Sequence, residues 1–241
     1  MARKPNYGID APGVIRNFFV ASAVCLVLAL GVRSLTIGHV HLDFYPGFLY
    51  SAVWFAVPGT LMLIYSLSGK FRHRDRILAK VPWTGTETVL DVGAGRGLLL
   101  IGAAKLLTTG HATGIDIWNA ADLTGNLPEA LLANISLEGV ANKTTVKSED
   151  ARQMSFVDGS FDVVVSNLCL HNIYERPGRS KACHEIARVL KSGGMAVISD
   201  YKLMAEYTSE FRACGMTVEM FPRDWTGTFP PLRILVARKR D

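Results

Sequence analysis

Three glycines that alternate with other residues are the feature of this sequence with the clearest chemical meaning. They directly follow an apolar stretch, in the order Val89-Leu90-Asp91-Val92-Gly93-Ala94-Gly95-Arg96-Gly97. Residues 98–107 come next, and their apolar excess without proline predicts a helix packed on a sheet. Glycine lets a backbone turn tightly and approach a ligand closely, and a helix start offers free N–H groups to an anion. The stretch therefore predicts a loop that binds a nucleotide cofactor.

The spacing of these glycines distinguishes two classes of cofactor. A dinucleotide loop follows the pattern G-x-G-x-x-G, whereas Gly93, Gly95 and Gly97 are one residue tighter. Asp91 lies two residues before the first glycine, where a carboxylate could meet the ammonium group of a ligand. The arrangement resembles the first motif of class I S-adenosylmethionine-dependent methyltransferases, in which the loop surrounds the methionine end of the cofactor. A nicotinamide-dependent oxidoreductase fits this glycine spacing less well.

Three later stretches resemble further motifs of the same family, in the family's order. They are Ala112–Trp118, Val146–Ala151 and Ser160–His171. The resemblance implies that Asp116 accepts the ribose hydroxyls, that Asp150 or else Glu149 accepts the adenine amine, and that Asn167 borders the transferred methyl. Trp118 lies near the adenine face or serves ordinary packing. The full set of expected cofactor contacts is Asp91, Gly93, Ala94, Gly95, Gly97, Asp116, Ile117, Trp118, Asp150, Ala151 and Asn167.

The rest of the chain after residue 85 alternates between strand and helix patterns. Such alternation predicts an α/β domain whose parallel sheet is covered by helices on both faces. The resemblance implies a Rossmann-like, seven-stranded, mostly parallel sheet whose final strand is antiparallel. Gly193-Gly194 is expected to close a helix. The expected helices are 128–137, 179–190 and 203–214, and the expected later strands are 144–147, 195–200, 217–221 and 232–237.

Two uncharged stretches in the first 70 residues predict a pair of transmembrane helices. Residues 17–32 form 16 uncharged positions between Arg16 and Arg33, and residues 44–69 form 26. A bilayer core needs about 20 apolar residues, so we expect spans near 14–33 and 44–67. A cleaved signal peptide, a buried helix and an interfacial hairpin are the alternatives. We therefore divide the chain into a membrane hairpin (1–69), a basic juxtamembrane linker (70–84) and a methyltransferase domain (85–241).

The distribution of charge predicts the orientation of this hairpin. Residues 1–80 carry a net charge of +6, and residues 81–241 carry −1. Basic residues precede the first span and follow the second, whereas the connection between them carries one charge of each sign. By the positive-inside rule, both termini and the catalytic domain are cytoplasmic in a multi-pass membrane protein. We expect the basic residues between Lys70 and Lys80 to contact anionic headgroups as well.

The same composition disfavours other classes of function. A nucleic-acid-binding domain should carry a basic face, but this domain is nearly neutral, so we expect no nucleic-acid partner. The four cysteines show no C-x-x-C spacing, which predicts reduced thiols and neither a metal site nor a disulfide framework. They are Cys25, Cys169, Cys183 and Cys214.

The expected chemistry is an in-line displacement at a sulfonium, for which alignment and exclusion of water matter most. A general base is needed when the acceptor still carries its proton. His171, Tyr174, Asp200 and Tyr201 are candidates, and we take His171, Tyr174 and Asp200 as the catalytic set. His171 is the first choice because imidazole titrates near neutral pH, although a purely structural histidine remains an alternative.

These features together predict a membrane-anchored, S-adenosylmethionine-dependent methyltransferase. A membrane anchor on a neutral domain favours a small, lipid-soluble acceptor. The alternatives are a membrane-tethered module that binds S-adenosylmethionine without turnover, and a protein methyltransferase. The sequence determines neither the identity of the acceptor nor the oligomeric state.

Overall fold

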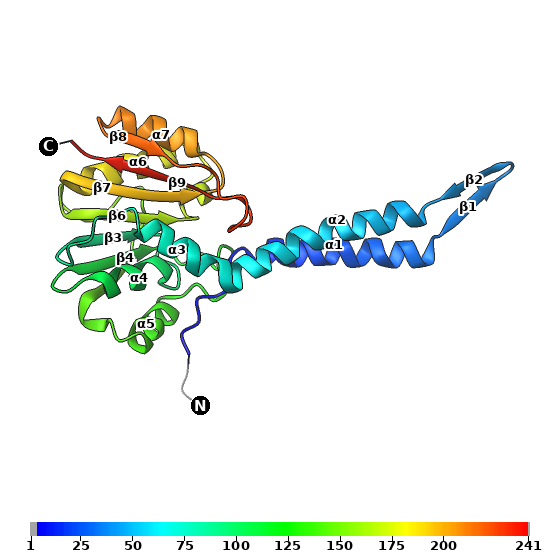
Figure 1. Ribbon diagram of the computed structural model, residues 1–241, viewed down its shortest axis with the longest axis horizontal. Coiled ribbons are helices and arrows are strands. Elements are labelled where there is room, and N and C mark those ends of the chain that lie inside the picture. The colour runs from blue at the N-terminus through cyan, green and yellow to red at the C-terminus, as the bar shows by residue number, and fades with distance from the viewer. Residues whose placement is uncertain (1–3, 241) are drawn as a thin grey trace.

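The structure is a computed structural model that describes residues 4–240. A long helical hairpin projects from one end of an α/β domain (Figure 1). Arg3, which we counted among the basic residues before the first span, lies outside the described residues. The outermost residues of the segments 1–69 and 85–241 lie outside them too.

The α/β domain is built on a seven-stranded sheet with the order β5-β4-β3-β6-β7-β9-β8. Neighbouring strands from β5 to β7 are parallel, whereas β9 is antiparallel to both β7 and β8. This confirms the mostly parallel sheet and the reversed final strand. The strands are β3 (Thr88–Val92), β4 (His111–Asp116), β5 (Thr144–Ser148), β6 (Phe161–Asn167), β7 (Leu190–Asp200), β8 (Thr217–Met220) and β9 (Arg233–Arg238).

Helices cover both faces of this sheet because the central strands are apolar on both sides. Successive side chains of a strand point to opposite faces, and in β3 the fully buried Val89 and Leu90 accordingly belong to two different core clusters. The first cluster packs under α3 (Lys70–Leu78), α4 (Leu98–Leu106) and α5 (Pro128–Leu137). The second packs under α6 (Arg176–Val189) and α7 (Met204–Ala213).

The glycine pair after α6 differs from expectation. The helix already ends at Val189, and Gly193 and Gly194 lie within β7. A Cβ atom on Gly194 would lie 2.8 Å from the carbonyl oxygen of Lys191. The glycine is therefore required by a close backbone approach inside the strand rather than by a helix end.

The hairpin consists of α1 (Pro12–Gly31), a two-stranded ribbon and α2 (Tyr45–Ile64). The ribbon pairs β1 (Ser34–Ile37) with β2 (Val40–Asp43) in antiparallel register, and it is exposed throughout. Both helices are long and apolar enough to cross a membrane, judged by length and composition. Large apolar side chains on them face outward, such as Val27, which is 68% exposed, and Trp54, which is 64% exposed.

The segment expected to be a linker is instead a structured continuation of α2. A π-helical turn, η1 (Tyr65–Gly69), joins α2 directly to α3. Ile77 and Leu78 of α3 are buried in the domain core, and Lys70 is only 2% exposed. One continuous helical rod thus leads from the hairpin into the domain. We had expected Lys70 to contact lipid headgroups, but its side chain is buried.

Candidate active site

The carboxyl ends of the parallel strands lie at the edge of the sheet from which the hairpin emerges (Figure 1). Two contacts fix this arrangement. Asp10, just before α1, pairs with Leu123 in the loop after β4. On α3, the Nε2 atom of His73 lies 2.6 Å from Oγ of Ser199 near the end of β7. Because ligands of such sheets bind at the carboxyl ends of the strands, the hairpin and the candidate site share one end of the domain.

The glycine loop adopts the backbone conformation that its composition predicts. Gly93, Gly95 and Gly97 have φ angles of 77°, 53° and 89°, in the left-handed region that favours glycine. The N–H groups of Gly93 and Ala94 both donate to the carbonyl oxygen of Ile115 at the end of β4. A Cβ atom on Gly93 would collide with the side chain of Cys169, so this position cannot accept a larger residue without rearrangement.

Asp91 lies beneath this loop and caps the helix that follows. Its Oδ2 atom accepts the N–H of Leu100, in the first turn of α4, at 2.8 Å. The side chain is 1% exposed. Burial raises the pKa of Asp91 to about 7, although the Leu100 N–H group lowers it. This contact assigns Asp91 a structural role in addition to the expected contact with the ligand ammonium group.

Asp116, at the end of β4, faces the glycine loop as expected. One carboxylate oxygen accepts the N–H of Gly95 at 2.8 Å, and the other accepts the N–H of Trp118 at 2.6 Å. The side-chain amide of Asn126 donates to the same carboxylate at 3.3 Å. Asn126 carries no signal in the sequence beyond its place in a polar loop.

The two residues after Asp116 point in different directions. Ile117 is 65% exposed. Trp118 has a φ angle of 60°, which is strained for a non-glycine residue, and its indole N–H donates to Oγ of Ser148 at 2.7 Å. Trp118 also packs against the core cluster on one face of the sheet, so ordinary packing accounts for part of its role.

The acidic residues after β5 are engaged by the chain itself. Asp150 forms an ion pair with Arg152, which holds the pKa of that carboxyl below its usual range. Glu149 accepts hydrogen bonds from the N–H and the hydroxyl of Ser155. The next residue, Ala151, is buried. Each carboxylate would therefore have to give up or share an existing partner in order to accept an adenine amine.

A histidine and a carboxylate meet beyond the ends of β6 and β7. The Nδ1 atom of His171 lies 2.9 Å from Oδ1 of Asp200, which is fully buried. The ring of Tyr201 packs edge-on against the imidazole. Tyr174 does not join this group: its side chain is 90% exposed, and a phenol so open to water is a poor catalytic base. The structure thus brings together His171 and Asp200 but not Tyr174.

Two groups near Asn167, the hydroxyl of Tyr65 and the imidazole of His73, were not predicted from the sequence. The Oδ1 atom of Asn167 is buried without a hydrogen-bond partner among the described residues, and so are the hydroxyl of Tyr65 and Nδ1 of His73. Asn167 pairs with Ser199 in the sheet, and Ser199 contacts His73. Buried polar atoms are usually paired; the hydroxyl of Tyr65 and the side chain of Asn167 lie near enough to interact with each other, which leaves Nδ1 of His73 as the atom that suits a ligand.

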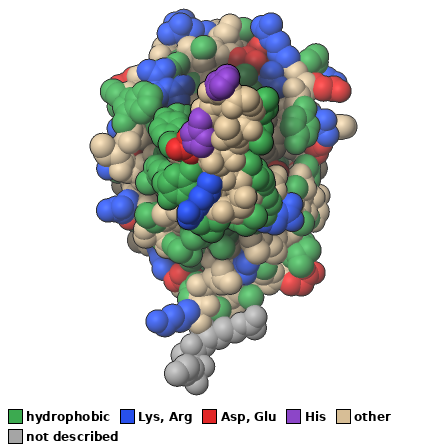
Figure 2. Space-filling model, turned by 90° about the vertical axis from the view of Figure 1, so that its right-hand side faces the viewer, with side chains coloured by type: hydrophobic (Ala, Val, Ile, Leu, Met, Phe, Trp, Pro, Cys, Tyr) green, Lys and Arg blue, Asp and Glu red, His purple; other side chains and the backbone are tan. Residues whose placement is uncertain are grey.

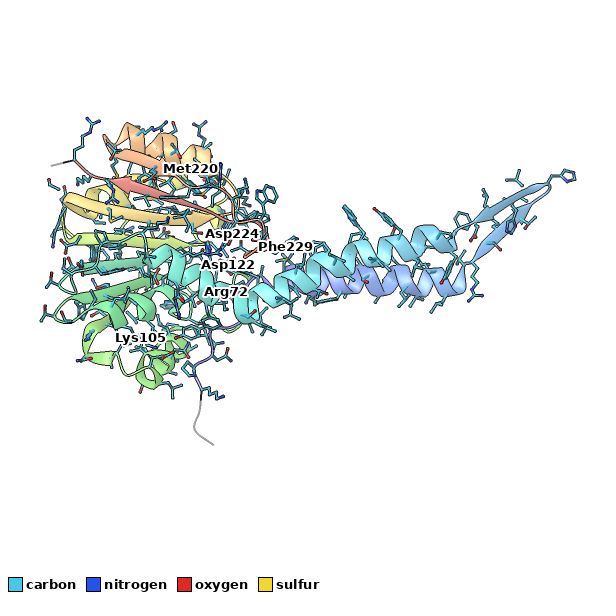
Figure 3. The ribbon with its side chains drawn as sticks, in the orientation of Figure 1. Arg72, Lys105, Asp122, Met220, Asp224 and Phe229 are labelled. Atoms are coloured by element: carbon cyan, nitrogen blue, oxygen red, sulfur yellow. The ribbon has the colours of Figure 1, made fainter. Side chains whose placement is uncertain are left out.

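The segment before α1, residues 4–11, covers the loop after β4, and we call it the N-terminal strap. The N–H of Ala11 donates to the carbonyl oxygen of Asp122, and the N–H of Thr124 donates to that of Ile9. Burial raises the pKa of Asp122, and the charge of the nearby His171 lowers it. Asp122 is labelled beside the base of the hairpin in Figure 3. The strap therefore positions a loop that lies between the cofactor side and the histidine.

Lys70 joins this strap to the helical rod. Its ammonium group donates to the carbonyl oxygens of Tyr7 and Gly8, at 2.8 and 2.6 Å, and lies 3.5 Å from the carboxylate of Asp10. Ser66 of η1 donates to the same carboxylate. The base of the hairpin is thus held to the strap by polar contacts around one buried cation.

These residues fit S-adenosylmethionine. The glycine loop accommodates a closely approaching ligand, and the carboxylate of Asp116, which accepts the N–H groups of Gly95 and Trp118, lies against that loop. The amide oxygens of Asn126 and Asn167 are buried without partners among the described residues. Such unpaired acceptors suit the N–H and O–H donors of this cofactor.

Comparison with known proteins agrees with this geometry. Residues 90–198 match a family described as a methyltransferase domain. An uncharacterized protein of Haemophilus influenzae is 29% identical over 167 residues, which cover 67% of this chain and 63% of that protein. The demethylmenaquinone methyltransferase of Lactiplantibacillus plantarum is 30% identical over 133 residues, which cover 54% of this chain and 52% of that enzyme.

The fold of a solved structure is similar as well. An S-adenosylmethionine-dependent methyltransferase from Methanosarcina mazei superposes with a TM-score of 0.56 at 18% identity, and the match covers 68% of this chain and 97% of that one. The chain spans less than two thirds of the length of the curated relatives described above. Residues 90–198 therefore match a methyltransferase domain, and S-adenosylmethionine is the cofactor that this match implies.

Proposed function

We propose that this protein is a membrane-anchored methyltransferase that transfers a methyl group from S-adenosylmethionine to a small, lipid-soluble acceptor. One observation carries the proposal: the apolar hairpin leaves the domain at the same end of the sheet as the glycine loop and the His171–Asp200 pair (Figure 1). With α1 and α2 in a bilayer, this edge faces the membrane, and an acceptor dissolved there reaches the site without crossing water. A relative that is a demethylmenaquinone methyltransferase adds support for a small-molecule acceptor.

The membrane topology belongs to the same proposal. Both termini and the catalytic domain are cytoplasmic, and the ribbon between Ser34 and Asp43 is on the far side. The support is the charge pattern of the sequence, since most basic residues of the first 80 flank the hairpin at its domain end.

The residues of the site have different roles in the proposed reaction. S-adenosylmethionine supplies an electrophilic methyl group on a sulfonium. The glycine loop and Asp116 would hold and orient the cofactor, and Asn167 would border its methyl group. Asp200 accepts the Nδ1 proton of His171, which fixes the tautomer and leaves Nε2 to take a proton from the acceptor. Burial of this region excludes water, which favours transfer to the acceptor over hydrolysis.

The experiment that tests this proposal follows the transferred methyl. Native membranes that contain the protein are incubated with methyl-labelled S-adenosylmethionine, and the label is partitioned between organic extract, protein and nucleic acid. The Asp116→Ala variant, which removes the carboxylate, is the control, at a limiting concentration of S-adenosylmethionine. Label in the organic extract that depends on Asp116 supports the proposal.

The other outcomes of this assay separate the alternatives. Label in protein would identify a protein methyltransferase. Retained cofactor binding without label in any fraction would identify a tethered module that binds S-adenosylmethionine without turnover. Equal labelling by the Asp116→Ala variant at a limiting concentration of S-adenosylmethionine would contradict the assignment of the site.

A further inference from the structure

We propose that the loop between β8 and β9, residues 221–232, is a membrane-contact loop that places Trp225 among the headgroups of an anionic phospholipid bilayer. This inference rests on the membrane anchoring in the proposed function and adds a second contact with the bilayer, separate from the hairpin. We refer to residues 221–232 as the β8–β9 loop.

The position of this loop is fixed against the base of the hairpin. A Cβ atom on Gly69, the last residue of η1, would lie 3.2 Å from the carbonyl oxygen of Gly227. Asp224 forms an ion pair with Arg76 of α3 and accepts the N–H of Gly227. Figure 3 shows Asp224 and Phe229 on the side of the domain from which the helices leave. The loop thus lies where the helical rod passes from the hairpin to the domain.

Trp225 differs from the other tryptophans of the domain. Trp83 and Trp118 are partly buried, and their indole N–H groups donate to Leu78 and Ser148. Trp225 is 74% exposed and has no hydrogen bond to any of the described residues. Exposure of so large an apolar group is unfavourable in water, whereas the headgroup region of a bilayer suits both its ring and its N–H.

The charge around the loop favours anionic lipids. Arg72 of α3 is labelled beside the base of the hairpin in Figure 3, and Arg223 belongs to the loop itself. Figure 2 looks along the hairpin onto this end of the domain, and lysine and arginine side chains are spread around its rim. Basic residues near a membrane surface are attracted to anionic headgroups by about 1 kcal/mol each.

The loop is also connected to the candidate active site. The guanidinium of Arg223 donates to the carbonyl oxygens of Tyr201 and Pro231, at 2.9 and 3.1 Å. Tyr201 follows Asp200 and packs against His171. A loop seated on the bilayer would therefore hold the acceptor side of the site at the membrane surface, at the depth where the head of an amphiphilic acceptor lies.

Fluorescence quenching by brominated lipid tests this contact without any measurement of activity. The full-length protein is placed in nanodiscs of brominated phosphatidylcholine and phosphatidylglycerol, with single-tryptophan variants that retain either Trp225 or Trp54 of α2. A third variant has no native tryptophan and carries Val157→Trp. Val157 is 75% exposed and lies before β6, at the opposite end of the strands, so it is a control matched in exposure.

We expect bromine to reduce the emission of Trp225 and Trp54 but not that of the Val157→Trp variant. Quenching of Trp54 alone would overturn the membrane-contact loop and leave the hairpin intact. The absence of quenching at both positions would overturn membrane anchoring and this inference with it, whatever the outcome of the methyl-transfer assay. If the single-tryptophan variants fail to fold, the difference between the native chain and Trp225→Tyr gives the same readout.

Discussion

The candidate site has a cofactor side, around the glycine loop and Asp116, and an acceptor side, around Asn167 and His171. The two sides differ in which groups form hydrogen bonds with their polar side chains. On the cofactor side, the carboxylates of Asp91 and Asp116 accept backbone N–H groups from the adjoining loop and helix. On the acceptor side, polar atoms of Tyr65, His73 and Asn167 are buried without partners among the described residues. The two carboxylates on the cofactor side are thus held by their own backbone, although Oδ1 of Asn126 on that side is also unpaired among the described residues, whereas the acceptor side includes side chains supplied by the helical rod.

This difference implies that the two sides should respond to different changes. Substitutions at the carboxyl ends of β6 and β7, such as those of His171 and Asp200, should change kcat more than the Kd for S-adenosylmethionine. Substitutions around the glycine loop should alter affinity or stability first. Changes at the base of the hairpin should affect both, because the strap touches the cofactor side and the rod touches the acceptor side.

The largest effect is expected from His171→Asn and from Asp200→Asn. Loss of a general base lowers kcat by about 10²- to 10⁴-fold, equal to about 3–5 kcal/mol, while the Kd for S-adenosylmethionine should stay unchanged. Steady-state kinetics and calorimetric titration measure the two quantities. His184→Asn is the control, since His184 is half exposed on α6 and lies near Glu210. Unchanged kcat in the first two variants would leave His171 a structural residue.

A truncation that removes the strap should have the next largest effect. A chain of residues 70–241 loses the carbonyl and carboxylate partners of Lys70 and exposes its ammonium group to water, so it loses the hydrogen bonds of the strap, which contribute about 0.5–1.5 kcal/mol each and several kcal/mol together. A matched chain keeps the strap but joins residue 11 to residue 65 by a flexible linker. Urea unfolding should show the strapless chain to be the less stable by this amount. Equal stability of the two chains would show that the strap is dispensable.

Asp91→Asn should change how stability depends on pH. The pKa of Asp91 is raised to about 7 in the folded protein, so the native state holds a proton that the unfolded state releases above about pH 4. Native stability should therefore fall as pH rises from about 4 to about 7, by up to about 4 kcal/mol. The Asn variant lacks this contribution. Denaturant unfolding at several pH values gives the free energy of unfolding of both proteins. If that free energy depended on pH in the same way in both, the raised pKa of Asp91 would be contradicted.

The smallest effect is expected from Asp116→Ala. Hydrogen bonds to a charged group contribute about 1.5–3 kcal/mol, and the affinity for S-adenosylmethionine should fall by that amount. Calorimetric titration measures the change. Asp116→Asn retains an acceptor for the loop N–H groups and should lose less. Wild-type affinity in the Ala variant would refute a contact between Asp116 and the ribose.

The cofactor side could be predicted from the sequence because its parts lie within short motifs. The loop 93–97 and Asp116 each follow an apolar strand, and the alternation of strands and helices indicates that the strand ends meet at one edge. The acceptor side could not be predicted in the same way. Tyr65 and His73 are separated from Asn167 by more than 90 residues. The sequence predicts that Tyr65 belongs to a membrane span and His73 to a basic linker.

Other differences between the sequence-based predictions and the structure have local physical causes. A glycine pair signals either a helix end or a close backbone approach, and only the packing of Gly194 against Lys191 distinguishes them. Strap and loop pair across more than 100 residues, between Asp10 and Leu123, through backbone groups that carry no signature in the sequence. The spacing of residues in the sequence also does not predict how exposed a side chain is. For this reason Tyr174 was predicted to join His171 in the catalytic set.

The continuous helix from Tyr45 to Leu78 limits how the domain can move in a membrane. A flexible tether would let the domain tumble and meet acceptors from any direction. Under the proposed anchoring, a continuous rod would let the whole molecule rotate about the membrane normal and would limit changes in the height and tilt of the domain. Encounter with the proposed lipid-soluble acceptor would then be a lateral search within one leaflet, and its rate should depend on the surface density of the acceptor and on the viscosity of the bilayer.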